Sequence, residues 1–403
     1  MKEFLNNTFR GDKILWIIFG LFLSLSALEM YSASSSLAYK QASYFMPVWG
    51  HITFLCGGFL FAFLLHLLSP KVVMVFAPLL YLFSIATLVW VLISGVSVNE
   101  AARWANLMGV RFQPSEFAKL ALVVNLSIIL QLFTQERFFS KKVSYGIALA
   151  MAGFVSLLIF PENFSTALLC GIVTFTMMFY AKVPIKWLAK TIGCLLLFVV
   201  LFFSVAQVLP ENAVTHRTSV WVNRLKNFSE PTDEEAKFKV DDKNYQVAHA
   251  KIAISNSKYT GKGVGNSIER DFLPQAFSDF IFAIIIEEMG IGGACLVLFL
   301  YLILMYRAAM IAKECDSIYS AILVLGLSTM IVFQAFINMA VAVGLFPVTG
   351  QPLPLISRGG TSIIITSAYF GLMLGVSRES ALQKEGVEQK EKKEKKDKKG
   401  KDE

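Results

Sequence analysis

Ionisable side chains occur within several strongly apolar segments of this 403-residue chain, where a charge is costly and is usually kept for a function. Asp279 stands at the start of one such segment, and Glu287 and Glu288 follow inside it. Glu29 lies late in the first apolar segment. A carboxylate at the N-terminus of a helix is stabilised by free amides and the helix dipole. Asp279 is therefore interpreted either as a simple helix-terminal carboxylate or as a functional acid.

A second group of charges, Glu116 and Lys119, lies at the start of another apolar segment. Residues three apart share one helix face, so these two side chains can form an ion pair. Pro114 suits the first turn of the helix, and Ser115 is placed to bind its free amides. Two interpretations stay open: an internal ion pair that positions this helix, or part of a polar cavity that binds a substrate.

The loop before this helix combines Arg103 with Trp104 and ends at Gln113. The guanidinium of an arginine can grip a phosphate, and an indole offers a flat face to a sugar. Aromatic and basic residues also anchor membrane proteins at the bilayer surface. The pair is therefore either a substrate contact or a plain interface anchor.

Two irregular segments are rich in glycine. Residues 346–362 contain three prolines and three glycines, and such backbone is tolerated at membrane depth only where protein buries it or it lines a watery cavity. Residues 260–265 read Thr-Gly-Lys-Gly-Val-Gly, so the backbone and Lys262 could cradle a phosphate, although a flexible turn is commoner. Just before them, small and apolar residues from Tyr245 to Ser255, with Lys251 among them, predict a short helix on the membrane surface.

An unusually apolar chain must position these residues. Hydrophobic residues make up 55% of it and charged residues 16%, against about 25% charged in soluble domains. Ten apolar runs are long enough, or nearly so, to cross about 30 Å of hydrocarbon. The predicted spans are 14–35, 47–68, 72–94, 115–133, 143–160, 164–181, 185–209, 279–306, 318–345 and 356–377. The predicted fold class is an all-α polytopic membrane protein with ten transmembrane helices, formed by residues 1–382.

The Lys and Arg residues of the short links divide thirteen to four between the two sides of this arrangement. The positive-inside rule then places both termini in the cytoplasm. Residues 210–278, with ten basic and nine acidic side chains, become a large extracytoplasmic loop between helices 7 and 8. Residues 383–403 hold nine Lys and seven acidic residues and are predicted to be a disordered cytoplasmic tail.

Several classes of function find no support in the residues. The five cysteines form no CxxC and the four histidines no HExxH, so a zinc site is not indicated. The glycines form neither GxGxxG nor a P-loop, so nucleotide binding is not indicated either. The net charge of +8 is mostly the cationic rim that sets orientation, so it does not point to nucleic acid. The residues alone leave a transporter and an enzyme both open.

Taken together, four blocks of sequence resemble the SEDS family (shape, elongation, division and sporulation) of bacterial peptidoglycan polymerases. The blocks occur in family order along the chain, which makes the resemblance specific. They are Arg103-Trp104 with Gln113-Pro114-Ser115-Glu116 and Lys119; Tyr245-Gln246-Val247 through Lys251 to Gly261-Lys262-Gly263-Val264-Gly265-Asn266-Ser267; Leu273-Pro274 to Asp279-Phe280-Ile281-Phe282-Ala283 with Glu287-Glu288-Met289-Gly290; and Asn338 through Pro347-Val348-Thr349-Gly350 and Pro352-Leu353-Pro354 to Ser357-Arg358-Gly359-Gly360-Thr361-Ser362.

Details of the sequence point to the division-type branch of this family rather than the elongation-type branch. Tyr31 to Ser35 after the first span and Leu355 to Ser357 before the glycines carry that likeness. The chain also departs from the family pattern. Glu162-Asn163-Phe164-Ser165 replaces the family's Asp-x-Gly, Phe277-Ser278 replaces His-Thr, and Arg358 replaces the commoner Tyr. A mechanism that needs a histidine beside Asp279 is therefore not supported.

The resemblance implies glycosyl transfer between lipid-linked disaccharide-pentapeptide units, with undecaprenyl pyrophosphate as the leaving group. Asp279 matches the family's essential aspartate, so it is expected to be the general base or the ligand of a divalent cation, Mg²⁺ or Mn²⁺. Cationic groups are expected on the departing pyrophosphate. The expected substrate-binding residues are Arg103, Trp104, Gln113, Ser115, Glu116, Lys119, Lys251, Lys262, Ser357, Gly359 and Gly360.

The resemblance also implies partners and a location. The expected partners are lipid II, undecaprenyl-linked glycan, a class B penicillin-binding protein that supplies transpeptidase activity, and other division proteins, with no nucleic acid. The expected location is the bacterial cytoplasmic membrane at the division septum. Three alternatives stay open: a lipid II flippase, a non-catalytic division scaffold, and the elongation-type polymerase of the same family.

Overall fold

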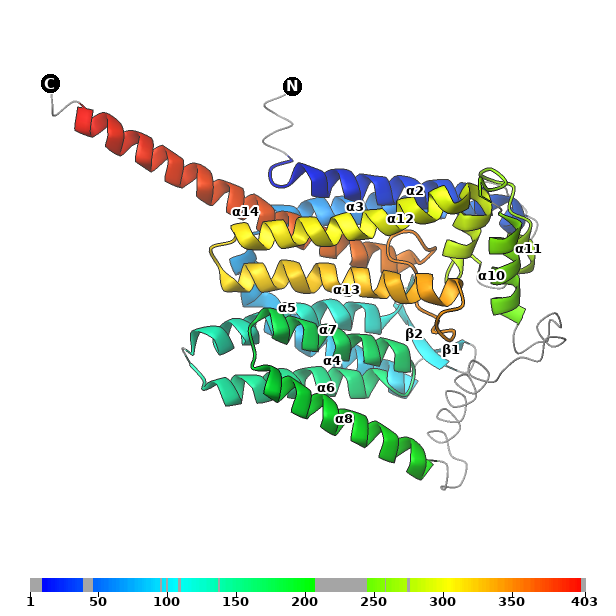
Figure 1. The fold of residues 1–403 in the computed structure, drawn as a ribbon, viewed down its shortest axis with the longest axis horizontal. Coiled ribbons are helices and arrows are strands. Elements are labelled where there is room, and N and C mark those ends of the chain that lie inside the picture. The colour runs from blue at the N-terminus through cyan, green and yellow to red at the C-terminus, as the bar shows by residue number, and fades with distance from the viewer. Residues whose placement is uncertain are drawn as a thin grey trace.

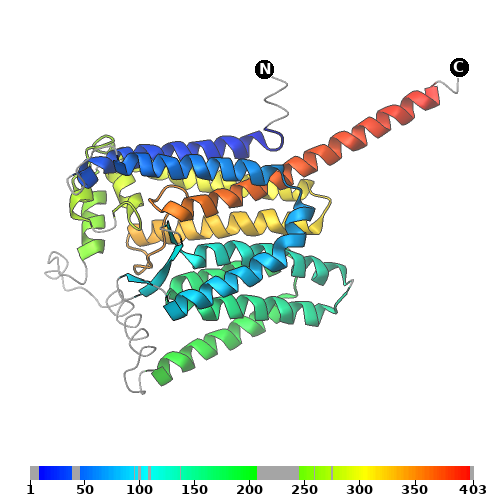
Figure 2. The same ribbon diagram turned by 180° about the vertical axis from the view of Figure 1, so that it is seen from behind.

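A computed structural model shows the chain as a bundle of long helices that run along one axis (Figures 1 and 2). The structure describes residues 9–38, 46–94, 96–98, 101–107, 110–136, 138–206, 245–257, 259–273 and 276–399. Residues 210–244, the first half of the predicted large loop, lie outside this part. Side chains of the described helix ends and strands are placed for fewer residues, and those of Arg103 and Trp104 are not among them.

Each predicted apolar run coincides with a helix. Within the described residues, eight helices are long and apolar enough to cross a bilayer. These are α2 (Lys13–Ala38), α3 (Met46–Leu67), α4 (Pro70–Ser94), α5 (Pro114–Gln135), α6 (Lys141–Ile159), α12 (Ile281–Glu314), α13 (Ile318–Ala342) and α14 (Gly360–Lys399). Two more runs form the shorter apolar helix α7 (Phe164–Tyr180) and the helix α8 (Ile185–Ala206), so the predicted number of ten spans is not confirmed.

The core of the bundle lies around α5 and α13, which pack against each other and against α7. Most residues of these two helices and of the apolar part of α14 are buried, whereas α3, α4 and α6 expose most of theirs. Exposed Leu, Phe and Val side chains on the outer helices are the expected surface of a protein whose solvent is lipid. Polar groups on α5 and α13 therefore lie where neither lipid nor bulk water can satisfy them.

Three short antiparallel strands connect α4 with α5, and the sequence did not predict them. They are β1 (Val96–Val98), β2 (Ala101–Leu107) and β3 (Val110–Phe112), in the order β1-β2-β3. Trp104 pairs with Val96 across the first ladder, and Ala105 pairs with Phe112 across the second. The predicted contact residues Arg103 and Trp104 are thus held by a strand rather than by an irregular loop.

The bundle has two unlike ends. At one end, which we call the Asp279 end, the helices α10 (Tyr245–Asn256) and α11 (Glu269–Phe272) lie across the bundle near the strands (Figure 1). The helix predicted from Tyr245 onward is confirmed by α10. At the opposite end, which we call the terminal end, α2 begins and α14 leaves the bundle (Figures 1 and 2). An ion pair of 3.0 Å joins Arg10, just before α2, to Glu385 on α14.

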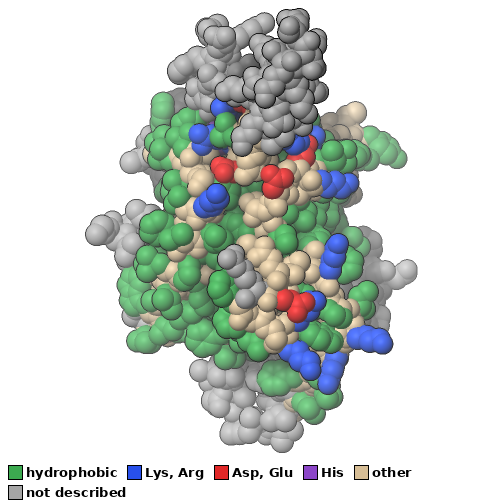
Figure 3. Space-filling model, turned by 90° about the vertical axis from the view of Figure 1, so that its left-hand side faces the viewer, with side chains coloured by type: hydrophobic (Ala, Val, Ile, Leu, Met, Phe, Trp, Pro, Cys, Tyr) green, Lys and Arg blue, Asp and Glu red, His purple; other side chains and the backbone are tan. Residues whose placement is uncertain are grey.

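Lys and Arg side chains gather at the terminal end (Figure 3). Exposed lysines stand at helix ends there. They include Lys71, Lys141, Lys182, Lys186 and Lys313. Acidic groups at this end are often paired, as in the ion pair of Arg307 with Asp12. The cationic rim predicted from the links is therefore gathered on one face of the folded bundle.

The structure differs from the sequence prediction for the tail. Residues 383–399, predicted to be disordered, continue α14 as a helix to Lys399. Lys and Glu alternate there at separations of three and four residues, which stabilise a helix without any core. Lys384 also pairs with Glu314 at 3.1 Å, so the beginning of this extension is tied to the bundle.

A break in α12 shapes the Asp279 end. Gly290 has φ 67° and ψ −160°, which no helix can contain, so the carbonyls just before it lose their helical donors. The glycine-rich segment replaces those donors. The amides of Lys262 and Gly263 donate to the carbonyls of Glu287 and Glu288 at 2.9 and 2.8 Å. Gly261 has φ 75°, and a Cβ there would lie 2.3 Å from the carbonyl oxygen of Glu288.

This close approach predicts that Gly261→Ala lowers the free energy of unfolding by about 1–3 kcal/mol, because the backbone of α12 cannot give way to a methyl group. Gly265→Ala is the matched control, since Gly265 also has a positive φ (86°) but has open space around its Cβ position. Thermal unfolding in detergent, followed by tryptophan fluorescence, compares the two. Equal losses in both variants would show that only the backbone angle matters and would contradict the predicted clash.

Candidate functional site

Asp279 lies just before α12 at the Asp279 end of the bundle. The helix begins at Ile281 with Phe280 as its N-cap, so Asp279 lies just outside it. The hydroxyl of Ser278 donates to Oδ1 of Asp279 at 2.8 Å. The side chain is neither buried nor fully exposed. Asp279 is therefore a partly accessible carboxylate beside the apolar bundle, where it can meet a substrate.

The backbone of Asp279 is held from α13. The Nδ2 group of Asn338 donates to the carbonyl of Asp279 at 2.7 Å and to the carbonyl of Gln351 at 2.8 Å. Gln351 in turn donates from Nε2 to the hydroxyl of Thr166 on α7. These side chains are buried, so each bond is made where water does not compete for it. The chain of amides fixes Asp279 relative to both α13 and α7.

The irregular segment predicted between α13 and α14 supports the same place. Its residues from Leu353 to Ser357 are buried, as expected for non-helical backbone in such a protein. The hydroxyl of Ser357 accepts from the amide of Leu353 at 2.7 Å and donates to the carbonyl of Ser278 at 2.5 Å. The amide of Arg358 donates to the carbonyl of Phe277 at 2.7 Å. Ser357 thus positions the residues next to Asp279 rather than pointing to a ligand.

Glu116 and Lys119 form the ion pair that their spacing predicted, with Nζ of Lys119 2.7 Å from Oε1 of Glu116. Lys119 also donates to Oε1 of Gln334 at 2.5 Å, and Gln334 donates to the carbonyl of Pro352 at 3.0 Å. Lys119 is only 1% exposed and Glu116 only 4%. This arrangement favours the structural interpretation, in which the pair joins α5 to α13 and to the irregular segment.

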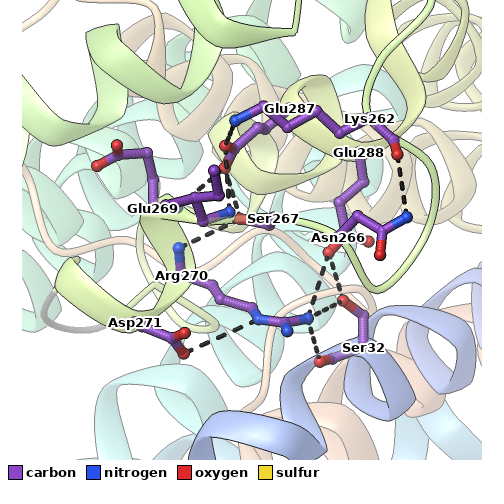
Figure 4. Close-up of polar contacts among 10 residues, drawn as sticks. Ser32, Lys262, Asn266, Ser267, Glu269, Arg270, Asp271, Glu287 and Glu288 are labelled. Atoms are coloured by element: carbon purple, nitrogen blue, oxygen red, sulfur yellow. Dashed lines mark hydrogen bonds and ion pairs between the residues drawn. The ribbon is translucent and has the colours of Figure 1, made fainter.

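Lys262 and Glu287 form a second junction, between the glycine-rich segment and α12 (Figure 4). Nζ of Lys262 lies 2.8 Å from Oε1 of the fully buried Glu287. The other carboxylate oxygen of Glu287 accepts from the hydroxyl of Ser267 at 2.5 Å and from the amide of Glu269 at 3.3 Å. The lysine and the glycine-rich amides predicted to cradle a phosphate are thus engaged in holding α12. A phosphate contact by Lys262 stays a prediction.

The other predicted residues are distributed around this end. Lys251 is exposed on α10, with its alkyl chain over the turn at Gly344. Gln113 precedes α5 and makes no side-chain cap bond to it. Ser115 is buried, and Gly359 and Gly360 are half-buried at the start of α14. Arg103 and Trp104 lie on β2. None of these placements tests a substrate role.

A cleft opens beside Ser115, between α4, α5 and α6. Apolar side chains of α4 and α6 form most of its wall, and three polar residues also line it. Its lining residues are Leu88, Val91, Leu92, Pro114, Ser115, Leu158, Ile159, Glu162 and Asn163. Asn163 accepts from the amide of Thr166, the residue that binds Gln351. The cleft is therefore connected to Asp279 through the buried amides.

A divalent cation at Asp279 would need ligands beyond the described His, Cys, Asp and Glu side chains. Within the described residues, no group of three or more His, Cys, Asp and Glu side chains could hold a metal. Magnesium is often bound by one or two carboxylates together with substrate phosphates. The carboxylate of Asp279 fits that arrangement, as a single ligand shared with a phosphate-bearing substrate.

Sequence reasoning missed the residues that hold Asp279 in place. Gln334 lies four residues before Asn338, so both amides project from one face of α13. Two amides at this spacing in a helix that is otherwise strongly apolar are a signal that could have been noticed, because each must find a buried partner. Thr166 and Gln351 carried no comparable signal, since their bond joins segments far apart in sequence.

Comparisons with known proteins agree with this geometry. The family model of FtsW, RodA and SpoVE, described as cell cycle protein, matches residues 12–382. The "Probable peptidoglycan glycosyltransferase FtsW" of Enterococcus hirae is 30% identical over 391 residues, which cover 93% of this chain and 95% of that protein. The protein of the same name from Haemophilus influenzae is 34% identical over 316 residues, covering 76% and 75%.

Solved structures show the same fold. A chain from "Structural coordination of polymerization and crosslinking by a peptidoglycan synthase complex" matches with a TM-score of 0.71 and 24% identity. The rod shape determining protein RodA of Thermus thermophilus matches with a TM-score of 0.65 and 24% identity. Each comparison covers 92% of this chain and 98% of the other. The apolar helices, the order of the motifs and these matches lead to one conclusion: the chain is a multi-pass membrane protein of the FtsW, RodA and SpoVE family.

Proposed function

We propose that this protein is a peptidoglycan glycosyltransferase that polymerises lipid II into glycan strands during cell division. The observation that carries the proposal is the partly exposed carboxylate of Asp279, held by Asn338 and by the Ser357 segment at one end of an apolar bundle. The relatives named as FtsW peptidoglycan glycosyltransferases support the substrate and the division role.

Asp279 acts as the general base in this proposal. Its carboxylate accepts the proton of the sugar 4-hydroxyl that attacks the anomeric carbon of the growing chain, and undecaprenyl pyrophosphate leaves. A base must lie within hydrogen-bond reach of the proton that it removes. The bonds of Asn338 and Ser357 to the backbone on either side of the carboxylate restrict its position and so serve this requirement.

The departing pyrophosphate needs positive charge near it. Lys251 and Arg358 are exposed at this end of the bundle, and Arg103 lies on the nearby strand β2. Lys262 is a weaker candidate, because its charge is already balanced by the buried Glu287. A divalent cation bound by Asp279 and the phosphates would add to this charge.

The distribution of charge supports an orientation. The exposed lysines at the terminal end would face the cytoplasm, together with both termini. Asp279 then lies at the outer surface of the cytoplasmic membrane, where the lipid-linked substrate is presented, and the division role places the protein at the septum. The complex named for the structural neighbour supports a class B penicillin-binding protein as the partner that cross-links the product.

Loss of the base should abolish polymerisation. Asp279→Asn is expected to lower the rate at least about 100-fold, because an amide cannot take the proton. Asp271→Asn is the matched control, since Asp271 is an exposed acid on the nearby helix α11. The assay follows glycan polymer from purified lipid II, with protein and partner transpeptidase in vesicles.

The same assay separates the alternatives. Polymer formed by Asp279→Asn at the wild-type rate would remove Asp279 as the base. If the wild-type protein with its partner forms no polymer but moves lipid II across the vesicle membrane, the flippase takes the place of the enzyme. If the wild-type protein with its partner neither forms polymer nor moves lipid II, the non-catalytic division scaffold is the remaining alternative.

Removal of divalent cations should slow the reaction if Asp279 shares a cation with the substrate. Treatment with EDTA is expected to lower the polymerisation rate, and added Mg²⁺ or Mn²⁺ is expected to restore it. Melting of the protein, measured in parallel, checks that the chelator does not unfold it. An unchanged rate in EDTA would contradict the cation and leave the base role standing.

A further inference from the structure

Two buried acids face each other away from Asp279, at the contact between α2 and α12. Glu29 lies on α2 and Glu288 lies on α12, and each is only 1% exposed. Neither takes part in the site described above. Their position is unusual because an ionised carboxylate inside a bundle is stable only with compensating charge and hydrogen bonds.

Ser32 and Arg270 contact Glu288 at this place (Figure 4). The hydroxyl of Ser32 donates to Oε1 of Glu288. Glu29 precedes Ser32 by three residues on α2, so the two side chains share a helix face. The carboxylates of Glu29 and Glu288 are close enough for like charges on them to repel each other. Arg270 completes the group: its guanidinium donates to the carbonyl of Ser32 at 2.8 Å and lies 3.9 Å from Oε1 of Glu288.

Three carboxylate oxygens at this contact have no hydrogen-bond partner within the described part of the chain. They are Oε1 and Oε2 of Glu29 and Oε2 of Glu288. A buried acceptor left without a donor is strongly unfavourable. Nε of Arg270 is also buried without a partner, so it does not reach these oxygens, and the contact needs a donor from elsewhere.

The charges around the contact do not balance either. Within the described residues, the ion pairs at this contact join the single guanidinium of Arg270 to Glu288 and to Asp271, each at 3.9 Å, and Glu29 has none. Nearby, Lys262 pairs with Glu287, and Nδ1 of His249 lies 2.6 Å from Oε2 of Glu269.

From the helices packed on the other side of α2, His51 bonds to Ser26, one turn before Glu29. The positive charge of Arg358 lies close enough to His51 to disfavour a second positive charge there. The acids of the contact thus carry one more negative charge than Arg270 neutralises.

We propose that Glu29 and Glu288 bind one proton between them, so that the carboxylic acid of Glu29 donates to Oε2 of Glu288. A single proton supplies the missing donor and the missing positive charge at once. A metal ion fits less well, since the described residues contain no group of three or more metal-ligating side chains. Small hard cations prefer six or more oxygen ligands.

The proton site joins the first helix to the helix that follows Asp279. Glu288 lies two residues before the break at Gly290. Arg270 lies on α11, which follows the glycine-rich segment that bonds to this break. Loss of the proton places two like charges in contact between α2 and α12. The bound proton therefore stabilises the docking of α2 on the Asp279 end, independently of the reaction proposed for Asp279.

Infrared spectroscopy in D₂O tests the site directly. The wild-type protein is expected to show the carbonyl band of a buried protonated carboxylic acid at neutral pH, and Glu29→Gln is expected to lack it. Glu136→Gln is the matched control, because Glu136 is exposed and paired with Lys141. It should keep the band. A wild-type spectrum without the band, or a band that Glu29→Gln keeps, would overturn the proposal.

Unfolding provides the second measurement. A proton that the folded state holds and the unfolded state releases makes stability fall as the pH rises. The melting temperature of the wild type in detergent should therefore decrease from neutral to alkaline pH more steeply than that of Glu29→Gln, whose amide donates without titrating. All other titratable groups are the same in both proteins, so their contributions cancel in the difference. Equal slopes would contradict the proton site.

Melting temperatures in sodium and in choline salts, at fixed pH and ionic strength, distinguish a bound proton from a bound metal ion. The proton site predicts no difference between the two salts. A sodium-dependent rise in melting temperature that disappears in Glu29→Gln would assign the missing charge to a metal ion and overturn the proton. If Glu29→Gln does not fold, Glu288→Gln takes its place, since it also leaves one acid beside one amide.

Discussion

Backbone that leaves a helix inside an apolar bundle must find its hydrogen-bond partners within the protein, because lipid offers none. The Asp279 end is organised by this constraint. The segments before α12 and after α13 are both irregular, and they satisfy each other through Asn338, Gln351 and Ser357. The bonds that satisfy this backbone therefore also restrict the position of Asp279, as our proposal of a general base requires. Asp279 stays partly accessible while the backbone beneath it is fully engaged.

Buried charges likewise find their partners within the protein. Lys119 forms an ion pair with Glu116 and donates to Gln334, and Lys262 forms an ion pair with Glu287. Two cations that look available for a ligand in the sequence therefore hold the structure together. The glycine-rich amides follow the same logic, since they replace the donors that α12 loses at its break. Within the described residues, Lys251 on α10 and Arg358 beside Ser357 form no ion pair, so our proposal assigns the phosphates of the substrate to them.

The sequence predicted what depends on local pattern. Apolar runs of about twenty residues became helices, and the three-residue spacing of Glu116 and Lys119 became an ion pair. The prediction did not extend to the partners of Lys262, which come from a helix twenty-five residues away. The strands around Trp104 were also missed, because their ladders are short and offer little alternation. Asp279 was located through the likeness of its surrounding motif, whereas the bonds by which Asn338 and Gln351 hold it appeared only in the folded structure.

The break at Gly290 has a mechanical consequence. A straight helix of the length of α12, 34 residues, would extend about 51 Å, well beyond the roughly 30 Å of hydrocarbon that it must cross. The break divides this length in two. The amides of Lys262 and Gly263 hold the shorter part, which lies next to Asp279, and the longer part begins after Gly290. The length of helix that matches the hydrocarbon is therefore separate from the length that positions Asp279.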